Sequence, residues 1–171
     1  VTPRCGWGCF AAGGWTFVVA GLLIACSGFL LAVLWMDLIF DTQAAGRRPG
    51  GGQLPEPVLS SIAAYYRRAT TTSQPMGRLI AAVMLVLLGA LGFESVRGDS
   101  PAWLLIASGL LAGGPILLAL IRTVPHAVRL GRRSDDAVEQ TRLARAILGD
   151  HVLCALGMLA FLVLWLVDSA R

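Results

Sequence analysis

Four ionisable side chains that could bind a metal ion or carry a proton lie at the borders of apolar stretches in this sequence. They are Asp37, Asp41, His126 and His151, and the two histidines are the only ones in the chain. Asp37 and Asp41 are four residues apart, so a helix would place them on one face. Carboxylates and imidazoles are ligands of divalent metals, and imidazole exchanges protons near neutral pH. These four residues therefore form a candidate metal or proton site.

Arginine pairing is the other interpretation of the same two carboxylates. Arg122, Arg129 or the adjacent Arg67 and Arg68 would pair with Asp37 and Asp41. Such pairs would form a structural collar of charges where the chain leaves the membrane. We expect this collar, so no cofactor is predicted, and a divalent metal or a proton at the four residues is the alternative. Haem ligation is disfavoured because it would need histidines deeper within the spans.

Composition indicates what surrounds these residues. Hydrophobic residues make up 56% of the 171 residues and charged residues only 14%, and the mean hydropathy is +0.72. Soluble domains are nearer to about 45–50% apolar and about 25% charged. The composition excludes a disordered segment, a soluble enzyme domain and a disulfide-stapled miniprotein. It predicts an integral membrane protein.

Four apolar stretches are long enough to cross a bilayer, whose hydrocarbon core requires about 20 residues of helix. The expected spans cover residues 15–40, 76–93, 102–121 and 151–167, joined by loops 41–75 and 122–150 on one side. The chain is therefore expected to form one membrane domain over residues 1–171. Its predicted fold is an all-α, four-helix antiparallel transmembrane bundle.

The first of these loops contains a further candidate helix. Residues 58–68 carry apolar side chains at helical spacing, and Tyr65 and Tyr66 come directly before two arginines. Tyrosine at the headgroup level with arginine beside it is typical of a short interfacial helix. The alternative is a helix docked on the ends of the spans, and the sequence leaves both open.

Arginine distribution predicts the orientation. All fourteen basic residues are arginine, and eleven of them fall within residues 41–78 and 122–150, against three on the other side. Cytoplasmic loops are enriched in basic residues, so both termini are expected outside. Arginine without lysine, together with many alanines and glycines, favours a bacterial plasma membrane. The positive charge is thereby assigned to membrane topology, and no nucleic-acid partner is predicted.

Small residues are expected to mediate contacts between the spans, because lipid gives helices little hydrophobic reason to associate. The first span carries Gly21, Ala25, Gly28 and Ala32 along one stripe, the third carries Gly109 and Gly113, and the fourth carries Gly157 and Ala160. Pro115 is expected to kink the third span.

Enzyme motifs are absent from the sequence. It contains no GxSxG, HExxH, P-loop or GxGxxG pattern, and the external pair Cys5 and Cys9 is compatible with a small disulfide loop but not with a thiol oxidase. The predicted function is a non-enzymatic accessory or interaction protein, whose partners are the lipid bilayer and other membrane subunits. The alternative is a small transporter or a metal- or proton-handling protein that uses the aspartate and histidine residues.

Overall fold

A computed structural model describes residues 8–45, 52–72, 74–97 and 100–170. Every regular element in these ranges is a helix. The expected disulfide loop of Cys5 and Cys9 lies outside the described residues.

The helices follow one another with few interruptions. In chain order they are α1 (Gly8–Asp41), the 3₁₀ turn η1 (Thr42–Ala45), α2 (Glu56–Arg67), the π turn η2 (Arg68–Thr72), α3 (Gln74–Arg97), α4 (Ala102–Ser108), the π turn η3 (Gly109–Gly113), α5 (Gly114–Leu118), the π turn η4 (Ala119–Thr123), α6 (Val124–Arg132) and α7 (Ala137–Ser169).

Four of these helical stretches are long and apolar enough to cross a membrane, as the sequence predicts. They are Phe17–Ala45, Pro75–Arg97, Ala102–Arg132 and Ala137–Ser169. The third is longer than expected, because residues 122–132, predicted as part of a loop, are helical. The fourth begins at Ala137, in agreement with the helical extension over residues 136–150 that the sequence also indicates. Arg133, with a φ of 53°, ends α6 in the left-handed conformation. Asp136 then starts α7, since its side chain accepts a hydrogen bond from the backbone N–H of Glu139.

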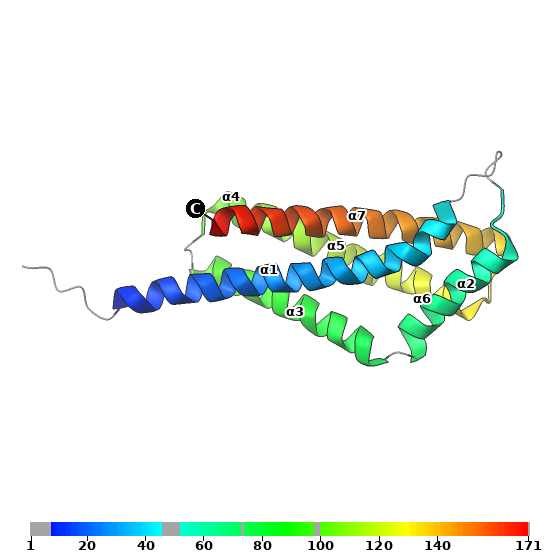
Figure 1. Cartoon of the computed structure of the whole chain (residues 1–171), viewed down its shortest axis with the longest axis horizontal. Helices are drawn as coiled ribbons and strands as arrows, with labels where there is room; N and C mark the ends of the chain where they lie inside the picture. The colour runs from blue at the N-terminus through cyan, green and yellow to red at the C-terminus, as the bar shows by residue number, and fades with distance from the viewer. Residues whose placement is uncertain (1–7, 46–51, 73, 98–99, 171) are drawn as a thin grey trace, which may run out of the picture.

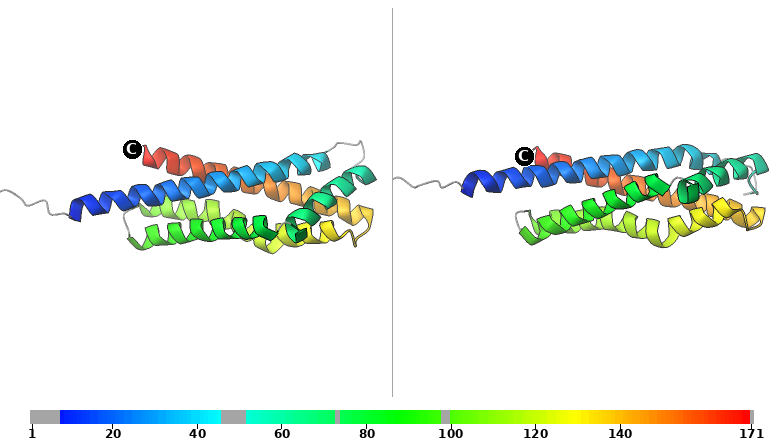
Figure 2. Two further views of the ribbon diagram at one scale, coloured as in Figure 1. Left: turned by 60° about the horizontal axis from the view of Figure 1, so that its bottom comes forward. Right: turned by 90° about the horizontal axis from the view of Figure 1, so that it is seen from below.

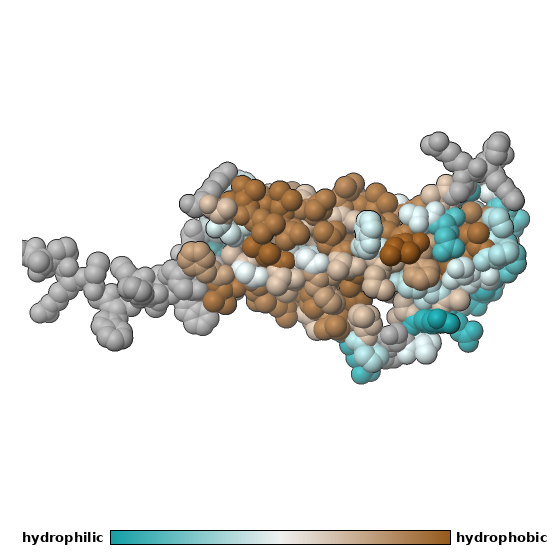
Figure 3. All heavy atoms as spheres, viewed as in Figure 1, coloured by the Kyte–Doolittle hydropathy of each residue, from teal (hydrophilic) through white to brown (hydrophobic). Residues whose placement is uncertain are grey.

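The long helices lie side by side along the molecule. α1 contacts both α7 and α3, and α1 and α7 run in opposite directions (Figures 1 and 2). Apolar side chains of these helices form one core that includes Leu23, Leu87, Leu104 and Phe161. Apolar residues also cover the surface along most of this length, whereas hydrophilic residues gather at the end that carries α2 (Figure 3). This surface pattern is typical of a protein that lies in a bilayer.

A second core fills the end of the molecule formed by α2, α6 and the start of α7, which we call the α2 end. Leu59 and Ile62 of α2 are buried there against Leu130 of α6 and Leu143 of α7. The backbone N–H of Leu54, before α2, donates a hydrogen bond of 3.1 Å to Thr141 Oγ1. Of the two arrangements that the sequence left open for this helix, the contacts show the docked one.

Close packing of the glycine stripes is a prediction that the structure does not bear out for the first and third spans. A Cβ atom added at Gly21, Gly28, Gly109 or Gly113 would meet nothing within 4 Å outside its own helix. The first helix instead packs through a stripe of larger residues, Val19, Leu23, Cys26 and Leu30. The spacing of small residues shows that they share a face, but larger side chains on another face bury more surface.

The third span is irregular on both sides of Pro115. The π turns η3 and η4 flank the short helix α5, which contains this proline. Proline lacks the backbone N–H that would bond to residue 111, so the helix must adjust there. Gly157 of α7 packs closely against this irregular segment. A Cβ atom at position 157 would lie only 2.8 Å from Pro115 Cγ. The span changes direction between α5 and α6 (Figure 2).

Candidate functional site

Three buried side chains from three helices form a hydrogen-bond network at the α2 end. Asp41 is the last residue of α1, Tyr66 belongs to α2 and His151 to α7, and they are 1%, 3% and 8% exposed. His151 Nδ1 lies 2.6 Å from Asp41 Oδ2. The Tyr66 hydroxyl donates to Asp41 Oδ1 at 2.6 Å and lies 3.4 Å from His151 Nδ1. Both oxygens of the buried Asp41 carboxylate therefore have a partner.

Asp37 lies one helical turn before Asp41 and extends the network. The Tyr65 hydroxyl donates to Asp37 Oδ1 at 2.5 Å, and the Tyr65 ring stacks on Phe40 with 4.1 Å between centroids. Asp37 Oδ2 lies 3.9 Å from His151 Nε2. The imidazole of His151 is thus placed between two carboxylates.

Local helix geometry explains why two tyrosines reach two aspartates. Asp37 and Asp41 share a face of α1, and Tyr65 and Tyr66 point about 100° apart on α2. Burial raises the pKa of both Tyr65 and Tyr66, and the neighbouring carboxylates raise each pKa further. Both hydroxyls therefore keep their protons and act as donors to the aspartates.

The arginine collar predicted for Asp37 and Asp41 is not present among the described residues. His151 is the only ion-pair partner of these two carboxylates there. Arg122 lies 3.4 Å from Asp150, and Arg129 contacts Asp135 and Glu139. Docking of α2 explains the difference, because its buried face presents tyrosine hydroxyls at the positions where arginines were expected.

The four residues of the predicted metal or proton site are not all brought together. Asp37, Asp41 and His151 meet, but His126 stands apart on α6, and its Nδ1 is buried with no hydrogen-bond partner among the described residues. Thr123 instead contacts α7 and donates to Asp150 Oδ2 at 3.3 Å. Within the described ranges, no three His, Cys, Asp or Glu residues are arranged to hold a metal ion. Asp37, Asp41 and His151 are therefore the part of the predicted site that the structure brings together.

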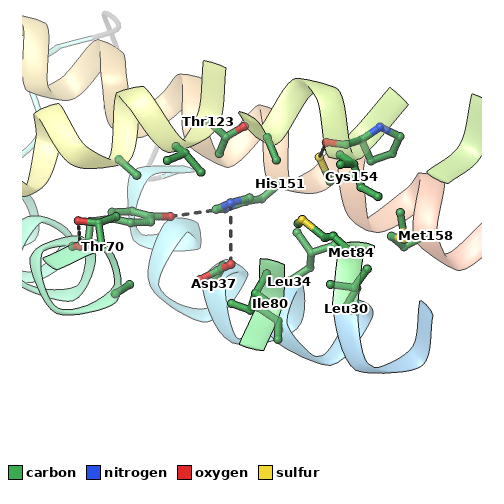
Figure 4. A pocket seen from close by; sticks show the side chains of 18 residues that line it. Leu30, Leu34, Asp37, Thr70, Ile80, Met84, Thr123, His151, Cys154 and Met158 are labelled. Carbon is green, nitrogen blue, oxygen red and sulfur yellow. Dashed lines mark hydrogen bonds and ion pairs between the residues drawn. The ribbon is translucent and has the colours of Figure 1, made fainter. Parts of the chain in front are cut away.

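A cavity of about 180 Å³ adjoins the network. Its polar wall contains Asp37, Tyr66, Thr70, Thr123 and His151. The remaining wall is almost entirely apolar and includes Leu30, Leu34, Ile80, Met84 and Met158 (Figure 4). A small number of polar groups at one end of an apolar cavity is the usual composition of a ligand site.

Two polar atoms of this wall, His151 Nε2 and Asp37 Oδ2, make no hydrogen bond with a described residue. The nearest polar neighbour of His151 Nε2 among the described residues is Asp37 Oδ2, at 3.9 Å, which is beyond hydrogen-bond distance. A bound molecule or a water could supply the missing partner from the cavity.

The charges around the cavity are unequal. Asp37 and Asp41 together carry two negative charges when ionised, and His151 carries at most one positive charge. Asp150 does not change the balance, because it is paired with Arg122. A carboxylate charge without a counter-ion in a largely buried site is stabilised by hydrogen bonds and water, by a proton or by a bound cation.

Sequence reasoning missed the two tyrosines and Thr123 of this arrangement, and one buried carboxylate elsewhere. The sequence places Tyr65 and Tyr66 on an interfacial or docked helix without a partner for their hydroxyls, and nothing in it points to Thr123. Glu94, near the opposite end of α3, is also buried, and it accepts a hydrogen bond of 2.7 Å from Ser100. The sequence does place the two tyrosines directly before arginines on an amphipathic segment. This pattern indicates that one face of the helix is buried, but it does not indicate which residues that face contacts.

Known proteins give no independent indication of function. No protein-family model matches the chain, and no curated protein or solved structure is significantly similar to it. The cavity and its charges are therefore the basis on which a function can be inferred.

Proposed function

We propose that this multi-pass membrane protein lies in a bacterial plasma membrane with both termini outside. The four apolar helices are long enough to span it, and we infer that they form one antiparallel bundle. The excess of arginine in the segments at the α2 end supports a cytoplasmic position for that end, with α2 docked at the membrane boundary. The lipid bilayer is then the main partner, and no nucleic acid is involved.

For the cavity, we propose a proton-linked function, in which it binds a compact lipophilic cation in exchange for a proton. The observation that carries this proposal is the charge imbalance between two carboxylates and one imidazole in a buried network. One proton or one cationic group restores the balance, and both cannot be held favourably at once. Competition for one carboxylate couples cation binding to proton release.

Asp37 is the residue at which the exchange would occur. It lines the cavity, whereas Asp41 does not, and its Oδ2 accepts no hydrogen bond from a described residue. An ammonium group entering the cavity would donate to this oxygen, and the proton held by the carboxyl group would leave. The reaction is balanced: a protonated Asp37 and R–NH₃⁺ become an ion pair and a released proton.

The size and lining of the cavity define the rest of the ligand. A cavity of about 150 Å³ in another protein is large enough for benzene, and this one measures about 180 Å³. The apolar wall formed by Leu30, Ile80, Met84 and Met158 would contact the hydrocarbon part. A primary amine with one small ring therefore fits both the volume and the charge.

The test compares phenethylamine with 2-phenylethanol, its neutral analogue of similar shape. Titration calorimetry of the detergent-solubilised protein, in two buffers of different ionisation enthalpy, measures the affinity and the protons released. We expect the amine to bind at least about tenfold more tightly than the alcohol, with proton release. Asp37→Asn should remove both effects, and Asp168→Asn, which changes a carboxylate outside the cavity, should leave them unchanged.

Two results would contradict the proposal. Equal affinity for the amine and the alcohol would show that the cavity has no cation site. Amine binding that persists in Asp37→Asn would place the site elsewhere. Either result would favour the other function predicted from the sequence, a non-enzymatic accessory or interaction protein, which requires no ligand in this cavity.

A further inference from the structure

A second hollow lies between α2 and α6 and is lined by arginines. Its volume is about 510 Å³, and its lining includes Arg67, Arg68, Arg132 and Arg133. It shares no residue with the cavity beside His151. An inference about this hollow is therefore independent of the function proposed for that cavity.

Only one of these four arginines is paired within the described ranges. Arg133 lies 2.7 Å from the carboxylate of Glu56, and hydrogen bonds from Arg133 lower the pKa of Glu56, which keeps this carboxylate ionised. Arg67, Arg68 and Arg132 make no ion pair or hydrogen bond through their guanidinium groups with any residue that the structure describes. Four arginines less one glutamate leave three positive charges around one hollow.

Backbone packing brings the arginines of the two helices together. Gly131 touches α2 so closely that a Cβ atom there would lie 2.9 Å from the backbone nitrogen of Arg67. Arg132 directly follows this contact. Arg133 then adopts a φ of 53°, which ends α6 and is rare for a residue with a side chain. The hollow is thus built by a close helix contact and a fixed turn.

The hollow also lies beside the apolar surface of the molecule. Thr72 forms part of its lining, and the apolar span of α3 begins three residues later, at Pro75. The end of α2 and the start of α3 form the boundary between hydrophilic and apolar surface (Figure 3). A group bound in the hollow would therefore sit at the level of the lipid headgroups.

We propose that this hollow binds the phosphate group of an anionic phospholipid headgroup. Guanidinium groups bind phosphate through paired hydrogen bonds, and basic pockets beside the cytoplasmic ends of spanning helices bind anionic lipids. The shared chemistry is a phosphate oxyanion, which a lipid or free phosphate could supply. The position at the edge of the apolar surface assigns it to the lipid.

Native mass spectrometry of the full chain in detergent tests the proposal with dimyristoylphosphatidylglycerol and dimyristoylphosphatidylcholine. We expect the anionic lipid to bind at least about tenfold more tightly. The double variant Arg67→Gln/Arg68→Gln should lose this preference. The control Arg129→Gln/Arg142→Gln removes the same charge from arginines that pair with Glu139 outside the hollow, and it should keep the preference.

The outcomes separate the alternatives. Loss of the preference in both double variants would show a diffuse effect of net charge and overturn the site, as would equal binding of the two lipids. Displacement of the anionic lipid by inorganic phosphate at similar affinity would assign the hollow to soluble phosphate and overturn the lipid assignment. Circular dichroism melting of the variants confirms that each is folded. The titration with phenethylamine is unaffected by any of these results.

Discussion

Consecutive residues at the end of α2 and the start of η2 face two environments that differ in burial and in the sign of their charge. Tyr65 and Tyr66 face the carboxylates of Asp37 and Asp41 in a buried network, whereas Arg67 and Arg68 line an exposed hollow of positive charge. In the buried network, an unbalanced charge is costly, so protonation and binding are tightly coupled. In the hollow, water and salt screen the arginines, so the protein tolerates them without a ligand. Burial, more than charge itself, separates a site that affects stability from one that affects only binding.

The strongest test of this comparison removes the imidazole of His151 from the buried network. His151→Leu leaves Asp41 with only the Tyr66 hydroxyl, and Asp37 then faces a second carboxylate without an imidazole between them. Breaking one side of a buried ion pair costs about 3–5 kcal/mol, so we expect a loss of this size in the free energy of unfolding. Reversible unfolding in mixed detergent micelles, followed by circular dichroism, measures it.

A second substitution checks the physical reason for that loss. Adding Asp41→Asn to His151→Leu removes the unpaired charge, and it should restore part of the stability. If the double variant is as unstable as His151→Leu alone, the loss comes from packing at His151. The charges of the buried network would then not be the reason why this side of α2 affects stability and the arginine side does not.

Some of this arrangement could be predicted from the sequence. The four spans follow from apolar runs of sufficient length. Asp37 and Asp41 lie four residues apart on a helix, and His151 begins an apolar stretch at a similar depth. Their proximity therefore follows from the rise of about 1.5 Å per residue. The number of spans could therefore be predicted without the tertiary structure. The same holds for Asp37, Asp41 and His151, three of the four residues predicted for the site.

The rest depends on how helices rotate and dock. The π turn at Ala119–Thr123 adds a residue to one turn and rotates the helix beyond it, so Thr123 contacts Asp150 while His126 stands apart. The choice of tyrosine over arginine as the partner of Asp37 depends on the angle at which α2 docks. Likewise, the spacing of Gly21 and Gly28 defines a shared face but not what that face meets.

We expect an intermediate loss of stability from a substitution at Gly131, because its contact with α2 affects both sides of that helix. Gly131→Ala places a methyl group 2.9 Å from the backbone of Arg67, so α2 must shift away from α6. Overpacking of this kind costs about 1–3 kcal/mol, and the shift should also weaken the hydrogen bond from Tyr66 to Asp41. Unfolding measurements check the first effect, and the affinity for phenethylamine checks the second.

The matched control for this substitution is Gly28→Ala. A Cβ atom at Gly28 meets nothing within 4 Å, and alanine favours a helix more than glycine does. We therefore expect no loss of stability there. Equal losses at Gly131 and Gly28 would mean that the close contact between α6 and α2 does not hold the α2 end together.

The smallest effect at neutral pH, and the sharpest test of burial, concerns the ionisation of the two tyrosines. The chain contains only Tyr65 and Tyr66, so the ultraviolet absorbance of tyrosinate reports on this side of α2 alone. Burial and the neighbouring carboxylates raise the pKa of both residues above the ordinary value of about 10. Since the folded-state pKa is the higher one, their stabilising contribution is complete below about pH 10 and declines as the pH rises further. We expect the folded protein to give no tyrosinate signal where the unfolded chain titrates, and unfolding to become easier above that pH. A tyrosinate signal near pH 10 in the folded protein would show that water reaches these hydroxyls, and that the two sides of α2 do not differ in burial.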